Sequence, residues 1–295
     1  MSQPSIEQVI DQVAHLFSQV DLHYGHGTGN AYDEAAWAVH HVLNLPFDLD
    51  EQAYQEQVSA EDHKMIQTLM RLRIQSRKPM AYLTHKMWFA GLEFYVDERT
   101  LVPRSPIAEL ILNEFSPWLD IDASSNVLDL CTGSGCIGLA IAHYFPHLHV
   151  TATDLSQDAL DVAEINCQKL NLQERVHLVQ ADLFDGLPTE TYDLIISNPP
   201  YVPIDAISAL PDEFQTEPEM GLVSGGDGLF HVQKILQNAS NYLNDNGVLI
   251  VEVGLSADAL SSAYPELPFM WFEFEHGGEG VFMLTAKQLK AFAKP

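Results

Sequence analysis

The fold of this chain is decided by the stretch DLCTGSGCIG at residues 129–138. It follows an apolar run and contains the spacing G-x-G-x-x-G, in which glycines allow a tight turn from strand to helix and let the backbone approach a bound cofactor. Asp154 lies 21 residues beyond Gly133, at the end of the next predicted strand, where a carboxylate can accept hydrogen bonds from ribose hydroxyls. The pattern therefore predicts a site for a nucleoside-containing cofactor at the carboxyl end of a sheet.

After residue 120, apolar runs alternate with helical patterns, which predicts an α/β fold with a parallel sheet covered on both faces. Strands are predicted at 126–130, 149–153, 176–181, 192–197 and 247–253. Two further runs, 269–274 and 281–285, lie too close for a crossover helix and are predicted to pair as an antiparallel hairpin. A parallel sheet that ends in such a hairpin is typical of the seven-stranded class I methyltransferases. The glycine stretch therefore favours S-adenosylmethionine over a nicotinamide dinucleotide.

A second motif, Asn198-Pro199-Pro200-Tyr201, follows the predicted strand at 192–197. The prolines have no N–H and a fixed φ, and Pro200 keeps Pro199 out of the helical region, so the Pro199 carbonyl is held in one direction. The side-chain oxygen of Asn198 is a second acceptor beside it. Two such acceptors suit a planar NH₂ group with two hydrogens. The alternative is a tight proline turn without a chemical role.

Charge narrows the class of partner. The 295 residues include 41 acidic and 14 basic side chains, a net charge of −27, which disfavours nucleic acid and favours a basic partner. General solubility is the alternative explanation. No apolar run approaches the ~20 residues that cross a bilayer, and three cysteines without metal-ligand spacing fit a reducing compartment. We therefore expect a cytoplasmic protein with no membrane contact and no bound metal.

The first hundred residues have a different pattern. Helices are predicted after Ser5, from about Tyr32 to Leu43 and after Ser59, and a hairpin is predicted around Gly91. A further helix is predicted from Pro106 to about Trp118. The predicted division is a small, mainly helical domain at 1–85, a hairpin linker at 86–105 and a catalytic domain at 106–295.

Together these motifs resemble a known family. Residues 129–135, Asp154, residues 181–182 and residues 198–201 resemble the successive motifs of class I methyltransferases that act on conjugated NH₂ groups. The N-terminal part resembles the substrate-recognition domain of the protein-glutamine N5-methyltransferases, so the resemblance covers nearly the whole chain. One bacterial branch of that family modifies peptide release factors at a Gly-Gly-Gln glutamine, and another modifies ribosomal protein L-three. Three segments are similar to the second branch: YGHGT at 24–28, AYLT at 81–84 and LVPRSPI at 101–107.

The resemblance implies roles for individual residues. Those implied for binding S-adenosylmethionine are Asp129, Cys131, Thr132, Gly133, Ser134 and Gly135 at the methionine end, Asp154 at the ribose, Asp182 and Leu183 at the adenine, and Asn198. Those implied for catalysis and substrate binding are Asn198, Pro199, Pro200 and Tyr201. No general base is assigned, because an aligned amide nitrogen can lose its proton to water after methylation.

Several alternatives stay open from the sequence. The release-factor glutamine is the second candidate substrate, and a non-catalytic ribosome assembly factor is the third candidate function. A DNA adenine-N6 methyltransferase would use the same Asn-Pro-Pro-aromatic turn, but residues 101–295 contain only 7 basic against 27 acidic side chains. The acidic segment 211–228 is either a lid over the substrate or a surface loop.

One stretch, residues 64–86, is basic although the chain as a whole is acidic. It contains Lys64, Arg71, Arg73, Arg77, Lys78 and Lys86 and no acid. We expect it either to contact ribosomal RNA on an assembly intermediate or simply to stabilise the C-terminal end of its helix.

Overall fold

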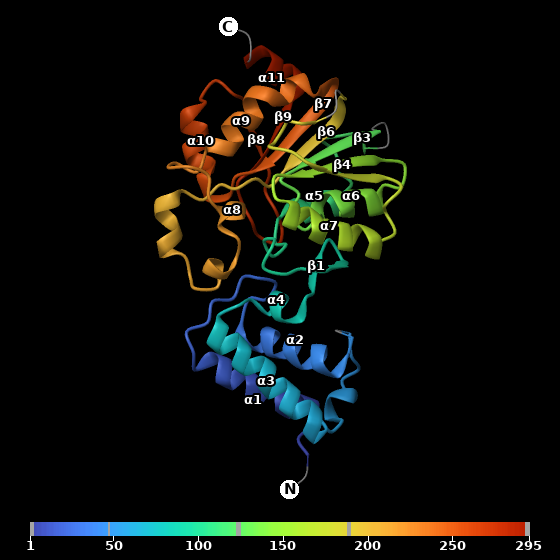
Figure 1. Cartoon of the computed structure of the whole chain (residues 1–295), viewed down its shortest axis with the longest axis vertical. Helices are drawn as coiled ribbons and strands as arrows, with labels where there is room; N and C mark the ends of the chain where they lie inside the picture. The colour runs from blue at the N-terminus through green and yellow to red at the C-terminus, as the bar shows by residue number, and fades with distance from the viewer. Residues whose placement is uncertain (1–2, 47, 122–124, 188–189, 293–295) are drawn as a thin grey trace.

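Side-chain caps start the long N-terminal helices. Ser5 accepts from the backbone N–H of Gln8, whose side chain accepts from Ser5 in return, and Asn30 and Ser59 cap the next two helices in the same position. The helices are α1 (Ile6–Ser18), α2 (Ala31–Leu43), α3 (Ala60–Ser76) and the short α4 (Met80–Thr84), with a 3₁₀ turn η1 (Ala53–Gln55) between α2 and α3. The three predicted helices are confirmed. Their apolar faces form a core of their own below the sheet (Figure 1).

The computed structural model describes residues 3–46, 48–121, 125–187 and 190–292. The predicted hairpin around Gly91 is confirmed as β1 (Met87–Phe89) and β2 (Leu92–Phe94), which pair antiparallel. Met87 packs into the core of the helical part, whereas Phe89 and Phe94 pack into the core of the larger part. The hairpin therefore joins two cores. The domain limits at residues 85 and 105 stay a prediction.

The helix predicted from Pro106 to Trp118 is shorter than expected. It is α5 (Ile107–Leu112), and Asn113 caps its end. Glu114 and Phe115 follow with φ of 55°, a left-handed conformation that ends a helix. The turn buries Phe115 in the core, where its ring contacts Phe145.

In the described part of the chain, seven strands form one sheet in the order β5-β4-β3-β6-β7-β9-β8. They are β3 (Asn126–Leu130), β4 (His149–Asp154), β5 (Val176–Gln180), β6 (Tyr192–Ser197), β7 (Leu243–Glu252), β8 (Met270–Trp271) and β9 (Val281–Thr285). The first five are parallel, and β9 runs antiparallel to both β7 and β8. The predicted seven-stranded sheet with an antiparallel end is confirmed. Only two residues of the predicted run 269–274, Met270 and Trp271, form strand.

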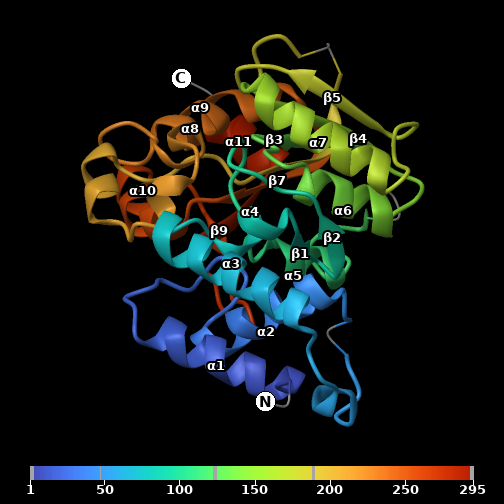
Figure 2. The same ribbon diagram turned by 60° about the horizontal axis from the view of Figure 1, so that its bottom comes forward.

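Helices cover both faces of this sheet (Figures 1 and 2). One face packs against α5, α6 (Cys136–Tyr144) and α7 (Gln157–Lys169), and the other against α9 (Phe230–Asn238), α10 (Ala257–Ala263) and α11 (Ala286–Phe292). The connection after β6 contains η3 (Ile204–Ala209), η4 (Phe214–Thr216) and α8 (Glu219–Leu222), and η5 (Ala239–Asn241) and η6 (Gly254–Ser256) flank β7. None of the helices in the described part of the chain is long and apolar enough to cross a bilayer.

The order of the strands positions the site. Chain connections leave β3 in one direction and β6 in the other, so the carboxyl ends of these neighbours flank a crevice. The glycine stretch follows β3, Asp154 ends β4, Asn198 follows β6 and Glu252 ends β7. Segments distant in the sequence therefore meet at one edge of the sheet.

Candidate active site

A cavity of about 390 Å³ opens at the carboxyl ends of these strands. Most of the residues predicted to bind the methyl donor line it: Cys131, Thr132, Gly133, Ser134, Asp154, Asp182 and Leu183. Asn198, Pro200 and Tyr201 line the same cavity. The structure thus brings the two predicted motifs together in one space.

The loop after β3 has an unusual backbone. Cys131, which is not glycine, has φ of 58°, and Gly133 and Gly135 also have positive φ. A Cβ on Gly133 would meet no atom within 4 Å, whereas a Cβ on Gly135 would lie 2.8 Å from the Leu139 side chain. Gly133 therefore leaves its backbone open to the cavity, and Gly135 allows the start of α6 to pack closely. Gly135 itself contributes nothing to the lining.

Asp129 is placed differently from the prediction. It is fully buried and does not line the cavity. Its carboxylate accepts from Thr132 Oγ1 at 2.5 Å and from the Gly138 N–H at 2.9 Å, and burial raises its pKa to about 7. The predicted contact of Asp129 with the donor is therefore corrected: its side chain holds the loop in shape from behind.

Asp154 lies at the cavity with its carboxylate held by two backbone donors. One oxygen accepts from the Gly133 N–H and the other from the Ser156 N–H, both at 2.9 Å. Each carboxylate oxygen keeps a lone pair for a further donor. Burial raises the pKa of Asp154, which these backbone donors oppose.

The prolines after Asn198 do not contribute equally. Pro200 lines the cavity, but Pro199 is buried and contributes no atom to the lining, so the predicted role of its carbonyl stays a prediction. The Tyr201 ring packs closely against Gly254. There is no room for a side chain there, since an added Cβ on Gly254 would lie 2.7 Å from the ring. The Tyr201 carbonyl accepts from Ser256 Oγ at 2.9 Å.

Glu252 is a cavity residue that the sequence reasoning missed. It is only 5 % exposed, and its carboxylate accepts from Ser105 Oγ at 2.5 Å and from the Tyr201 hydroxyl at 3.5 Å. Burial raises its pKa to about 7. Its position at the end of the strand next to Asn198 is the signal that could have revealed it.

A second missed group ties the segment 211–228 to the cavity. Arg104, which lines the cavity, donates two hydrogen bonds to Glu217, at 2.7 and 2.9 Å. His26 lies 3.4 Å from the same carboxylate. Burial acts to raise the pKa of Glu217, but the Arg104 charge and the His26 contact outweigh it and lower the pKa to about 2. Since Glu213 and Glu217 are buried, the interpretation of 211–228 as a plain surface loop is wrong.

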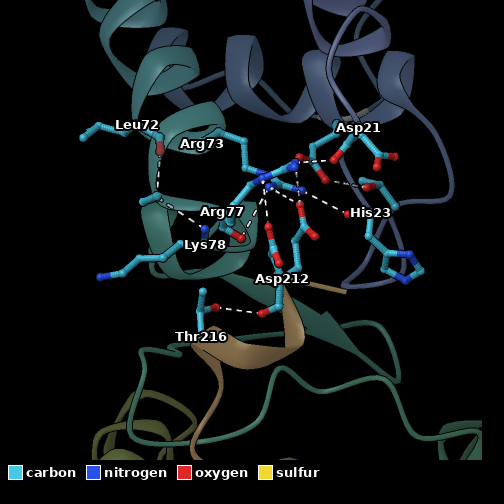
Figure 3. A network of polar contacts seen from close by, with 12 residues as sticks. Asp21, His23, Leu72, Arg73, Arg77, Lys78, Asp212 and Thr216 are labelled. Atoms are coloured by element: carbon cyan, nitrogen blue, oxygen red, sulfur yellow. Dashed lines mark hydrogen bonds and ion pairs between the residues drawn. The ribbon is translucent and has the colours of Figure 1, made fainter. Parts of the chain in front are cut away.

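The basic segment meets the same loop (Figure 3). Arg73 is 1 % exposed and donates to Glu34 at 2.6 Å, to Glu213 at 2.9 Å and to the His23 carbonyl at 3.0 Å. Arg77 lies 3.6 Å from Asp212 and 3.5 Å from Glu213.

The expected RNA contact is therefore corrected for Arg73, whose side chain is used inside the protein. Lys78 also pairs with Glu98, and Lys86 lies 3.5 Å from Glu93. Much of the predicted basic surface is thus paired with the protein's own acids.

Comparisons with known proteins agree with this geometry. Residues 108–232 match the methyltransferase small domain family. The chain is 45 % identical over 286 residues to a ribosomal protein uL3 glutamine methyltransferase of Neisseria meningitidis serogroup A, covering 97 % of this chain and 94 % of that protein. It is also 45 % identical to the enzyme of that description from Neisseria gonorrhoeae, over 97 % and 95 % of the two chains. The chain belongs to this glutamine methyltransferase family.

A solved structure supports the fold. The catalytic domain of hMettl16, crystallised with the MAT2A 3′UTR hairpin 6, superposes with a TM-score of 0.53 at 16 % identity, covering 77 % of this chain and 82 % of that one. At this identity the likeness concerns the fold alone.

This glutamine methyltransferase uses S-adenosylmethionine, which supplies an electrophilic methyl group on a positively charged sulfur. The cavity fits that donor, because Gly133 presents bare backbone to it and Asp154 a carboxylate with free lone pairs. We expect Cys131 to Ser134 to hold the methionine end, and Asp182 and Leu183 to contact the base. Leu183 is 6 % exposed and gives that end of the cavity an apolar wall.

Proposed function

We propose that this enzyme methylates the side-chain amide nitrogen of a glutamine in ribosomal protein uL3. The observation that carries the proposal is the placement of the Asn198 side chain in the donor cavity, beside the residues expected to hold S-adenosylmethionine. The identity to uL3 glutamine methyltransferases over nearly the whole chain supports the choice of substrate.

The reaction needs alignment more than proton removal. An amide nitrogen is a poor nucleophile because its lone pair is delocalised into the carbonyl. Hydrogen bonds from the substrate NH₂ to Asn198 Oδ1 and to the Pro199 carbonyl would orient the nitrogen and favour its pyramidal form. Alignment of reacting groups contributes on the order of 7–11 kcal/mol in favourable cases. Tyr201, half-buried at the cavity wall, would pack against the flat amide.

Charge supports a basic protein as the partner. The net charge of −27 attracts the basic side chains typical of ribosomal proteins and repels nucleic acid. The helical part, α1 to α4, is the proposed recognition domain. An RNA contact by residues 64–86 would rest on the exposed Lys64 and Arg71, since Arg73 is buried.

Transfer of an isotope-labelled methyl group tests the proposal. Purified enzyme and labelled S-adenosylmethionine are incubated separately with uL3 and with a peptide release factor, and the products are digested and mapped by mass spectrometry. The expected result is label on one glutamine of uL3 and none on the release factor. Label on the release factor alone, or label in neither protein, would contradict the assignment of uL3.

A further inference from the structure

Glu252 lies beside the residue that is proposed to bind the substrate amide. In the parallel pair β6 and β7, Ser197 is opposite Val251, so Asn198 and Glu252 are the next residues along the two neighbouring chains. Both line the donor cavity. Asn198 also acts to lower the pKa of Glu252, as an amide N–H group beside a carboxylate does.

The groups around this carboxylate are donors. Ser105 Oγ donates to one oxygen at 2.5 Å, and the Tyr201 hydroxyl donates to the other at 3.5 Å. Arg104 adds a positive charge nearby. A carboxylate can only accept hydrogen bonds, so the amide of Asn198 can bond to it only through its NH₂ group. Its oxygen is then left for the cavity.

We infer that Glu252 is a positioning residue that sets the orientation of the Asn198 amide and thereby makes the site select glutamine over glutamate. This inference rests on the proposed function. With Oδ1 of Asn198 facing the cavity, an incoming NH₂ finds an acceptor, whereas an incoming carboxylate meets oxygen against oxygen. If the amide were reversed, its NH₂ would face the cavity and would donate to a carboxylate instead.

The variant Glu252→Gln tests the orientation directly. A glutamine retains the size of Glu252 but has one acceptor and one donor group, so it can donate to Asn198 Oδ1 and hold the reversed amide. Kinetics are measured at pH 8 with a peptide that spans the glutamine mapped on methylated uL3. The same peptide with glutamate in place of that glutamine serves as a competitive inhibitor. Glu273→Gln is the matched control, since Glu273 is exposed and its replacement removes the same charge.

We expect E252Q to lower kcat/KM for the glutamine peptide at least tenfold. Selectivity is measured as the inhibition constant of the glutamate peptide divided by the KM of the glutamine peptide. We expect E252Q to lower this ratio at least tenfold. The affinity for S-adenosylmethionine, measured by calorimetry, should stay within threefold, and E273Q should match the wild type. A loss of activity with an unchanged ratio, or activity within threefold of wild type, would overturn the inference.

A measurement on the wild type keeps the test independent of the variant's folding. Protonation of Glu252 gives it a donor, as in E252Q, and its pKa is about 7. The charged or titratable groups that face it are Arg104, Tyr201 and Cys136; Arg104 stays charged, and burial raises the pKa of Tyr201 and of Cys136, so both stay neutral. Inhibition by the glutamate peptide should therefore strengthen several-fold from pH 8 to pH 6. Inhibition that is constant over this range would count against the inference, whereas absence of label on whole uL3 would refute the proposed function instead.

Discussion

Replacement of Arg73 by methionine should destabilise the protein far more than other changes on the same helix. The guanidinium is held between Glu34 and Glu213, whose side chains are 4 % and 2 % exposed, and its own side chain is 1 % exposed. Methionine fills the volume of the aliphatic stem but leaves Glu34 buried without its cation and Glu213 with only Arg77, 3.5 Å away. Removal of one partner from a buried ion pair costs about 3–5 kcal/mol, so we expect a loss of that size in the free energy of unfolding.

Urea denaturation followed by far-UV circular dichroism measures the effect. Arg71→Met is the matched control, because Arg71 is exposed on the same helix and a surface change of this kind stays within about 0.5 kcal/mol. A triple variant that also carries Glu34→Gln and Glu213→Gln should recover most of the loss, since no charge is then left buried. A loss below about 1 kcal/mol in R73M, or a triple variant no more stable than R73M, would refute this account.

Three further expectations concern the site and its loop. Asn198→Ala should cost ~2–3 kcal/mol, which lowers kcat/KM roughly 30- to 160-fold with circular dichroism unchanged; a variant that keeps more than about a tenth of the activity would contradict the role of Asn198. Asp154→Ala should weaken S-adenosylmethionine binding by roughly 1–3 kcal/mol in calorimetry, and an unchanged affinity would exclude the ribose contact. The pKa of Glu217 is lowered from 4.5 to about 2, so its contribution to stability is present above pH 4.5 and is lost as the pH falls toward 2. The difference in unfolding free energy between wild type and Glu217→Gln should therefore shrink over that range, and a constant difference would show that Glu217 does not titrate as described.

The strands could be predicted from sequence because they are buried apolar runs. The limits of β3, β6 and β9 match the predicted runs, since each is covered by a helical layer or a neighbouring strand on both sides. The end of α5 could not be predicted in the same way. Glu114 and Phe115 carry no local signal for a left-handed turn, and burial of Phe115 in the core determines it.

The same difference separates the site residues that a sequence motif can predict from those that it cannot. Residues that follow strands within one motif, such as Gly133 and Asn198, were found because the motif itself places them at the sheet edge. Glu252 meets Ser105 across 147 residues, and Arg73 meets Glu213 across 140. No periodicity in the sequence indicates pairs so distant along the chain. The sequence therefore predicts an exposed Arg73 on α3, whereas the structure buries it.

The loop that contains Glu213 and Glu217 limits how the helical part can move relative to the sheet. The covalent link between the helical part and the sheet runs through residues 86–105, and a single link of that kind would permit rotation. Arg73 on α3 pairs with Glu213, and Arg104 at the end of the covalent link pairs with Glu217, so the five residues 213–217 form a second connection between the two parts. This second connection restrains rotation of one part against the other, so a protein surface bound by the helices, as proposed, would be held at a constant distance from Asn198. On that proposal, the glutamine that is modified would be the one that lies at the matching distance from the recognised surface of the substrate.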